Sequence, residues 1–291
     1  MKNLKLLLAL TISVIVFSCG EDNDDILQPT EANLVIKLNF DANQPRLNNL
    51  GLPAAIPNGN AAQTPLVQKM SANYIEFAPT ANTQLGQGEV VFVGEATNSG
   101  GAMAIDFQEA IFAGDDEVFL TVPLSEVASG SYEWVRVSLA YQEGDIQVLT
   151  ENIGEVTGTL ASFVGYNNYI TKFDLNGSTI AVNDDVLQGF WAFEALGYTT
   201  QGQAPEGATT VPNPLFATSP VPQGSCIVTG EFSNAFIITG NETEDVTVTL
   251  SFSVNNSFEW TEVNADGKYE PSVGEQVVDM GLRGLIPSVS N

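Results

Sequence analysis

Alternation of apolar and polar residues with a period of two is the feature that most restricts how this chain can fold. From position 246 to 254, Val, Val, Leu, Phe and Val alternate with Thr, Thr, Ser and Ser, and residues 34–40 alternate in the same way. Successive side chains of a β-strand point to opposite faces, so each segment predicts a strand with one buried and one solvated face. No window of a dozen residues shows a convincing helical period; residues 124–128 predict a single helical turn.

Further strands are expected where short apolar runs lie between turn residues. Turn signals such as Asn176-Gly177 separate these runs, because Asn, Asp and Gly tolerate a positive φ. Many short strands without a repeat of fixed period favour an all-β fold with little helix, an antiparallel β-sandwich that is immunoglobulin-like or related. The other expected strands are 72–78, 89–94, 102–107, 117–122, 131–141, 158–164, 168–174, 189–195 and 226–237.

Residues 1–18 have the organisation of a signal peptide, since a basic start precedes an apolar run from Leu6 to Phe17. This run is shorter than the roughly 20 residues that a membrane-spanning helix needs. The sequence Val16-Phe17-Ser18-Cys19 resembles a bacterial lipobox, although Phe17 is bulkier than that pattern usually shows. The resemblance implies that Cys19 becomes the lipidated N-terminus; ordinary secretion with an unmodified Cys19 is the alternative.

Residues 19–32 are expected to form an acidic tether, because four acids occur among residues 21–25. Like charges repel one another and keep such a spacer extended. The run also resembles the acidic export signal of surface lipoproteins in Bacteroidota-type bacteria. That resemblance implies a protein held in the outer membrane by its lipid and exposed at the cell surface.

Residues 33–291 are expected to form one β-sandwich domain. The stretch 199–224 is rich in Pro and Gly and has little periodicity, so it predicts a long ordered loop on the sandwich; a boundary between two domains is the alternative. Cys226 begins an apolar run and is interpreted as a buried structural residue. If Cys19 carries lipid, no disulfide is expected.

The charge balance and the lack of histidine exclude several function classes. The chain has 9 Lys and Arg against 35 Asp and Glu, which argues against a nucleic-acid partner because clustered basic residues bind phosphates. Without His, the Ser-His-Asp and Cys-His nucleophile systems and imidazole zinc sites are excluded. We therefore expect a binding or accessory lipoprotein of the envelope, without enzyme activity. The sequence does not identify its ligand; a glycan and an envelope protein are the candidate partners. A carboxylate-dependent glycan hydrolase is the alternative.

Residues 262–275 partly match a calcium-binding loop, which places oxygen ligands at positions 1, 3 and 5 and a Gly at position 6. The acid that should close the loop comes two residues late. A hairpin turn is the alternative interpretation, because Asn, Asp and Gly favour turns. Weakly bound structural calcium is the only cofactor we consider. Its ligands would be Glu262, Asn264, Asp266, the carbonyl oxygen of Lys268, and Glu270 or Glu275.

Two predicted strands contain a tryptophan among aromatic or apolar neighbours. Alternation along 131–141 places Tyr132, Trp134 and Arg136 on one face, where they would stack against a sugar or an aromatic ligand. The alternative is a packed Trp134 with Arg136 paired to an acid. Residues 190–194 are apolar on both faces, so Trp191 and its neighbours are interpreted as core.

A resemblance in order and spacing covers five short segments of the chain. It is similar there to the copper-binding β-sandwich lipoproteins associated with methanobactin uptake, which implies a sandwich and an envelope location. The copper sites of that family use His, which this chain lacks, and Met70, Met103 and Met280 lie far apart in sequence. The segments are Asn60-Ala61-Ala62-Gln63-Thr64-Pro65, Asn73-Tyr74-Ile75, Ala104-Ile105-Asp106-Phe107, Gly130-Ser131-Tyr132 and Gly189-Phe190-Trp191.

Overall fold

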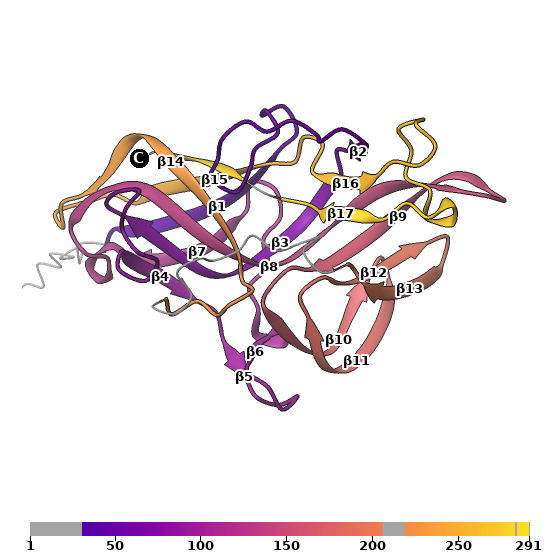
Figure 1. Cartoon of the computed structure of the whole chain (residues 1–291). Coiled ribbons are helices and arrows are strands. Elements are labelled where there is room, and N and C mark those ends of the chain that lie inside the picture. Colours follow the sequence, from indigo (N-terminus) through magenta and orange to yellow (C-terminus); the bar gives the residue numbers. More distant parts are fainter. Residues whose placement is uncertain (1–30, 206–218, 283, 291) are drawn as a thin grey trace, which may run out of the picture. The chain divides into compact units, whose positions relative to one another are not determined.

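The structure is a computed structural model that describes residues 31–205, 219–282 and 284–290 (Figure 1). The expected signal peptide, Cys19 and residues 19–30 of the tether lie outside the described residues. Residues 31–291 form one compact unit. Within the described ranges, no helix has the length and apolar character needed to cross a bilayer.

The chain is all-β, as the alternation predicts. The described helical segments are 3₁₀ turns of three residues, and one of them, Leu124–Glu126, is the turn expected at 124–128. The strands form four sheets.

The first sheet has four strands and supplies one layer of a sandwich. Its central strand β1 pairs in parallel with β15 and antiparallel with β7. β15 in turn pairs antiparallel with β18, which lies at the edge. The order is β18 (Leu285–Ser290), β15 (Val246–Ser253), β1 (Asn33–Asp41) and β7 (Val118–Pro123).

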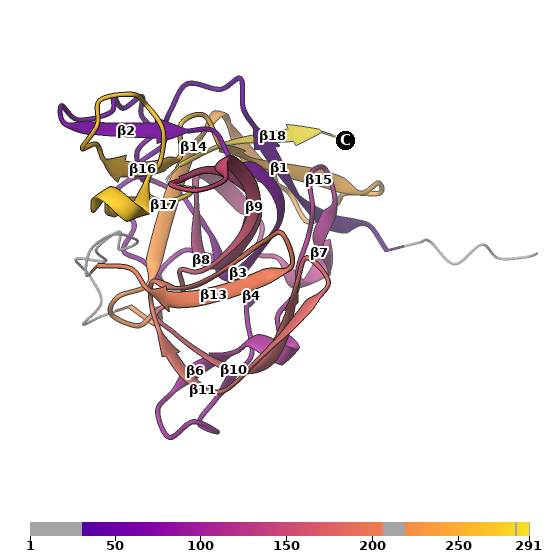
Figure 2. The ribbon, with the colours of Figure 1, turned by 90° about the vertical axis from the view of Figure 1, so that its right-hand side faces the viewer.

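The second sheet has seven strands and is organised around β8 (Gly130–Thr150), its longest strand. One side of β8 pairs with β3. The other side pairs first with β14 and then, from Tyr141 onward, with β9, so the sheet changes partner halfway along β8. Figure 2 shows the strong curvature of β8 and β9. The remaining strands are β3 (Leu66–Ala78), β4 (Glu89–Val93), β9 (Gly154–Phe163), β12 (Phe190–Ala195), β13 (Tyr198–Gln203) and β14 (Cys226–Ile238).

Two smaller sheets pack against the β9 end of the long sheet. One has the order β11-β10-β6-β5 and the other β17-β16-β2. Their strands are β5 (Ala96–Thr97), β6 (Ala104–Asp106), β10 (Asn167–Leu175), β11 (Ser178–Leu187), β2 (Asn60–Gln63), β16 (Phe258–Thr261) and β17 (Val277–Met280).

Three principal apolar cores hold these layers together. The largest lies between the first sheet and the β14-β8-β3 part of the second, where Leu34, Val248 and Val137 are fully buried. A second core surrounds Phe163 and joins β9 and β12 to β10 and β11. The third joins the opposite face of β8 and β9 to β16 through Trp260, and it borders the pocket described below.

The structure differs from the sequence expectations both in the strands it contains and in their relative directions. The expected loop at 199–224 begins with a strand, β13, which pairs with β12 even though its side chains are mostly exposed and polar. Ladder hydrogen bonds involve the backbone, so this strand needs no apolar alternation. Residues 206–218 lie outside the described part of the chain. The sandwich is also not purely antiparallel, because β1 pairs in parallel with β15 and β10 with β6.

Candidate functional site

A pocket of about 350 Å³ opens between the β8-β9-β12-β13 part of the long sheet and the small sheet of β16 and β17. Its size and its mostly apolar lining are typical of small-ligand sites. None of its described lining residues is Asp, Glu, Lys or Arg; the polar side chains come from Thr200, Gln203 and Gln276. The principal apolar residues are Ile146, Val148, Leu160, Trp191, Phe193, Phe258, Tyr269 and Met280.

β12 directs two aromatic side chains into this pocket. Phe190 and Ala192 pack in the core around Phe163, so alternation turns Trp191 and Phe193 to the other face, where both stay partly exposed. Each ring lies against a glycine. A Cβ on Gly202 would be 2.7 Å from the indole of Trp191, and one on Gly158 would be 2.2 Å from the ring of Phe193. The two glycines therefore make room for the rings that line the pocket.

Tyr269 forms part of the opposite wall and is fixed by three contacts. Its ring centroid lies 5.2 Å from that of Phe258 and 5.5 Å from that of Trp260, and its carbonyl oxygen accepts a 2.8 Å hydrogen bond from the N–H of Leu149 in β8. Burial, with a further contribution from the negative charge of Glu275, raises the pKa of the phenol to about 12. The pocket wall therefore carries a neutral hydroxyl at physiological pH.

The loop that carries Tyr269 is the segment expected to bind calcium. Glu262 accepts hydrogen bonds of 2.8 Å from the N–H groups of Asp266 and Gly267, and one of 3.0 Å from the indole N–H of Trp260. The buried carboxylate of Glu275 accepts from the N–H groups of Val263 (3.0 Å) and Glu270 (2.6 Å). Both carboxylates thus stabilise the loop by accepting hydrogen bonds from its own backbone. This arrangement corresponds to the hairpin-turn alternative.

The other expected calcium ligands also have partners inside the protein. Asp266 accepts from the N–H of Lys268, and Asn264 donates to Glu270. The ammonium of Lys268 lies 3.3 Å from Glu155 in β9, which attaches the loop to the long sheet. Among the described residues, no three acidic, His or Cys side chains come close enough to hold a metal ion. The structure brings the expected ligands into one loop, in which the carboxylates of Glu262, Asp266 and Glu275 accept hydrogen bonds from backbone N–H groups.

Tyr132, Trp134 and Arg136 do not form the shared exposed face that alternation predicts. Tyr132 is buried in the sandwich core, and its hydroxyl donates to the carbonyl oxygen of Ala128. Val135, three residues later, belongs to the same core. The pairing of β8 with β14 shifts register in the same region, where β14 carries extra residues between Glu231 and Phe236.

Arg136 is buried beneath a loop rather than presented to a ligand. It lies 4.0 Å from the fully buried Glu76 and donates to the carbonyl oxygen of Ala81. Glu76 also accepts from the N–H groups of Gly86 and Gly88. Trp134 is partly buried. This arrangement is the packed alternative, with Arg136 beside an acid.

The remaining strongly buried glutamates are candidates for the carboxylate pair that glycan hydrolysis requires. Each of them has a hydrogen-bond or ion-pair partner within the protein. Glu143 contacts the ammonium of Lys69 at 3.0 Å and accepts from the hydroxyl of Tyr141. Glu259 pairs with Arg46. Glu194 accepts a 2.7 Å hydrogen bond from the N–H of Gly197. These acids are bonded within the fold and are not among the residues that line the 350 Å³ pocket.

Sequence reasoning therefore missed the pocket residues of β12 and the role of Tyr269. The sequence predicts a core position for Trp191 and Phe193, because their strand is apolar on both faces. The signal that distinguishes them is the pair of glycines opposite, Gly158 and Gly202, but recognising it requires the strand register. No family model matches the chain, and comparisons with curated proteins and with solved structures found no match.

Proposed function

We propose that this protein is a non-catalytic binding module of the cell envelope that takes a neutral ligand with a flat apolar face in the pocket between β12 and Tyr269. The observation that carries the proposal is the lining: aromatic rings from both walls and amide side chains, without a charged residue among the described lining residues. Aromatic faces stack on the C–H face of a neutral sugar, so a neutral glycan is the ligand class we favour.

The envelope location is part of the proposal and rests on the leader and on the lipobox-like Ser18-Cys19. An outer-membrane lipid anchor would hold the pocket at the surface, where extracellular glycans are available. The hydrolase alternative requires two carboxyl groups about 5 Å or about 6.5–9.5 Å apart at the substrate. The pocket does not offer such a pair, because none of its described lining residues is Asp or Glu.

The test is a titration of the purified protein with neutral oligosaccharides, followed by the fluorescence of its tryptophans and by product analysis. Trp191→Ala should weaken binding at least about tenfold, as loss of a central aromatic contact does in other interfaces. Trp134→Ala is the matched control, because it removes a partly buried tryptophan that does not line the pocket.

Two outcomes would contradict the proposal. Loss of binding in Trp134→Ala, with Trp191→Ala unaffected, would move the ligand to the strand 131–141. Appearance of shortened oligosaccharides that disappears on removal of one acid would make the protein a hydrolase.

A further inference from the structure

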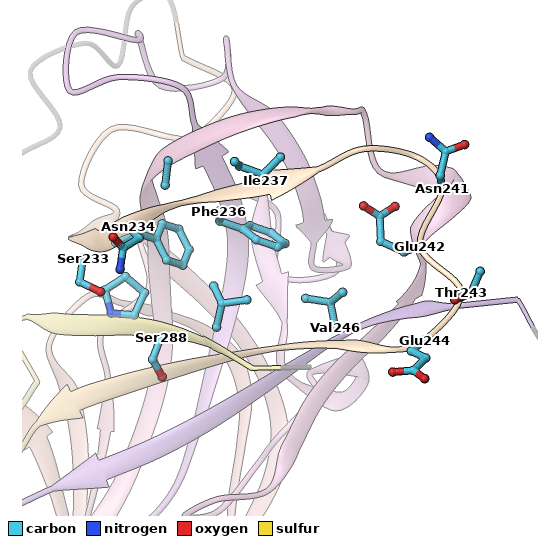
Figure 3. A pocket seen from close by; sticks show the side chains of 14 residues that line it. Ser233, Asn234, Phe236, Ile237, Asn241, Glu242, Thr243, Glu244, Val246 and Ser288 are labelled. Carbon is cyan, nitrogen blue, oxygen red and sulfur yellow. The ribbon is translucent and has the colours of Figure 1, made fainter.

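A second and larger pocket, of about 530 Å³, lies between two sheet edges (Figure 3). β14 pairs with β8 and β18 pairs with β15. Within the described sheets, each of these two strands has one neighbouring strand, so its other side is a sheet edge. The two strands face each other across the pocket. The sandwich is therefore open here between one edge of each layer.

The free edge of β18 can be assigned from the register. The N–H of Ser253 donates to the carbonyl oxygen of Gly284, so residues at even positions of β18 exchange hydrogen bonds with β15. In an antiparallel ladder the intervening residues point their N–H and C=O groups the other way. Leu285, Pro287 and Val289 therefore direct their backbone groups toward β14. Pro287 has no N–H, and it lies where the ladder with β15 requires none.

At its closed end, the gap between these edges already holds one segment of the chain. The carbonyl oxygen of Asn49 accepts a 2.8 Å hydrogen bond from the N–H of Thr229 in β14. A Cβ on Gly51 would lie 3.1 Å from the carbonyl oxygens of both Thr229 and Leu285. This segment thus packs against both strands, at a glycine whose φ is 72°. The two strands themselves meet beside it, because a Cβ on Gly230 of β14 would lie 2.7 Å from the carbonyl oxygen of Leu285.

At its open end, the gap has an apolar floor and an acidic mouth. Phe236 and Val246 face each other across the pocket in Figure 3, and both are buried. Glu242 and Glu244 lie at the mouth, and no Lys or Arg is among the described lining residues. Hydrogen bonds from Thr239 hold the pKa of Glu242 below its usual value, so that this carboxylate remains charged. The chain as a whole carries a formal charge of −26.

We infer that the open end binds an extended, basic segment of a partner polypeptide, which adds as a strand to the free edge of β18. Alternate side chains of the segment would cover Phe236 and Val246, and its Lys or Arg residues would meet Glu242 and Glu244. Strand addition of this kind obtains affinity from main-chain hydrogen bonds and specificity from the pockets for alternate side chains. A second copy of this acidic chain is a poor occupant because like charges repel.

The experiment uses a fluorescein-labelled peptide, Lys-Thr-Val-Thr-Val-Thr-Lys, and the same peptide with Glu in place of both Lys. Fluorescence polarisation should show binding of the Lys peptide that weakens with salt, and at least tenfold weaker binding of the Glu peptide. Val289→Pro removes the outward N–H without breaking the ladder to β15, and it should weaken binding at least tenfold. Val289→Thr keeps that N–H and should bind as the natural protein does.

Thermal melts and hydrogen exchange accompany the binding measurement. Thermal melts verify that the Val289 variants are folded, and if Val289→Pro is not, Glu244→Lys takes its place and should reverse the preference between the two peptides. Hydrogen exchange should slow at the amide of Val289 when the Lys peptide is bound. Failure of the Lys peptide to bind the natural protein, or equal binding by the two folded Val289 variants, would overturn the inference. The proposed glycan pocket is unaffected by either result.

Discussion

Single carboxylates stabilise the loop beside the proposed ligand pocket through hydrogen bonds to its backbone. Glu275 is the clearest case, since its side chain is buried and bridges both arms of the loop through the N–H groups of Val263 and Glu270. A buried N–H that loses its acceptor retains its desolvation penalty. The shape of the wall that presents Tyr269 therefore depends on a residue that does not line the pocket.

Glu275→Ala should lower the free energy of unfolding by about 2–4 kcal/mol, since it removes two hydrogen bonds to a buried charged group. Asp266→Ala is the control, because Asp266 is exposed and its carboxylate accepts a hydrogen bond from the N–H of Lys268. Its cost should be below about 1 kcal/mol. Urea unfolding of the three proteins measures both values. Equal stability of the two variants would show that the hydrogen bonds of Glu275 do not contribute to the free energy of unfolding.

The raised pKa of Tyr269 predicts that the free energy of unfolding falls at high pH. Its pKa is about 12 in the folded protein, against 10.0 for an ordinary tyrosine, because burial and Glu275 disfavour the phenolate. The stabilising contribution is complete below pH 10 and is lost as the pH rises through 12, because the unfolded chain releases this proton first. Tyr269→Phe should remove that loss, which is on the order of 2 kcal/mol. Parallel decline of the natural protein and the variant between pH 10 and 12 would contradict the assignment.

The candidate site illustrates what single residues reveal before a structure is known. Trp191 and Trp134 both occur in strands with apolar neighbours, and the alternation assigned the first to the core and the second to an exposed face. The structure places Trp191 in a pocket wall because Gly202 opposes it on β13. Tyr132 is buried beside Phe236, its partner on β14. Neither cross-strand neighbour is encoded in the local pattern.

At the scale of elements, residues 262–275 form a loop closed by its own carboxylates. Ala265 and Gly267 adopt positive φ values of 53° and 72°, and Glu262 accepts the N–H groups that the turn presents. A calcium ion would have to replace these hydrogen bonds before it could use the same oxygens. The geometry therefore favours the hairpin-turn interpretation of the segment.

Calcium should accordingly change the thermal stability of this protein very little. We expect the melting temperatures in millimolar calcium and in chelator to agree within about 1 °C, because the loop carboxylates already accept backbone hydrogen bonds. A weak extracellular site with a Kd of about 10⁻⁴–10⁻³ M would be occupied in millimolar calcium and would raise the melting temperature. The same comparison on Asp266→Ala is the control for non-specific salt effects. A calcium-dependent rise in the natural protein that is absent in Asp266→Ala would restore the calcium site.

Strand positions were predictable where alternation is strong, and less so elsewhere. The alternating segments at 34–40 and 246–254 correspond to β1 and β15, which form neighbouring strands of the sandwich. β13 was missed because its exposed residues Tyr198–Gln203 show no apolar face. β18 was missed as well, since Pro287 argues against a central strand and it lies instead at an edge. Pairing partners depend on contacts that are distant in sequence.

At the scale of the whole molecule, two surfaces of different chemistry lie on one acidic protein. The pocket beside β12 is apolar and has no charged residue among its described lining residues, whereas the β14–β18 gap has an acidic mouth. A strong net negative charge steers basic partners and repels acidic ones over distances of about a Debye length. A protein with both surfaces would capture a neutral ligand at one site and attach to a basic partner at the other.

Under the proposed envelope location, the lipid on Cys19 is what holds the protein in the membrane. Cys19→Ala should release it from the membrane fraction of the native cell, because a lipid chain contributes about 0.8 kcal/mol of membrane affinity per buried CH₂ and no other anchor is proposed. Cys226→Ala is the matched control: Cys226 is buried in β14, so its replacement should leave the protein in the membrane fraction. Fractionation followed by immunoblotting, with protease added to intact cells, reports both membrane attachment and surface exposure. If Cys19→Ala remains with the membranes, the lipid-anchor proposal is wrong.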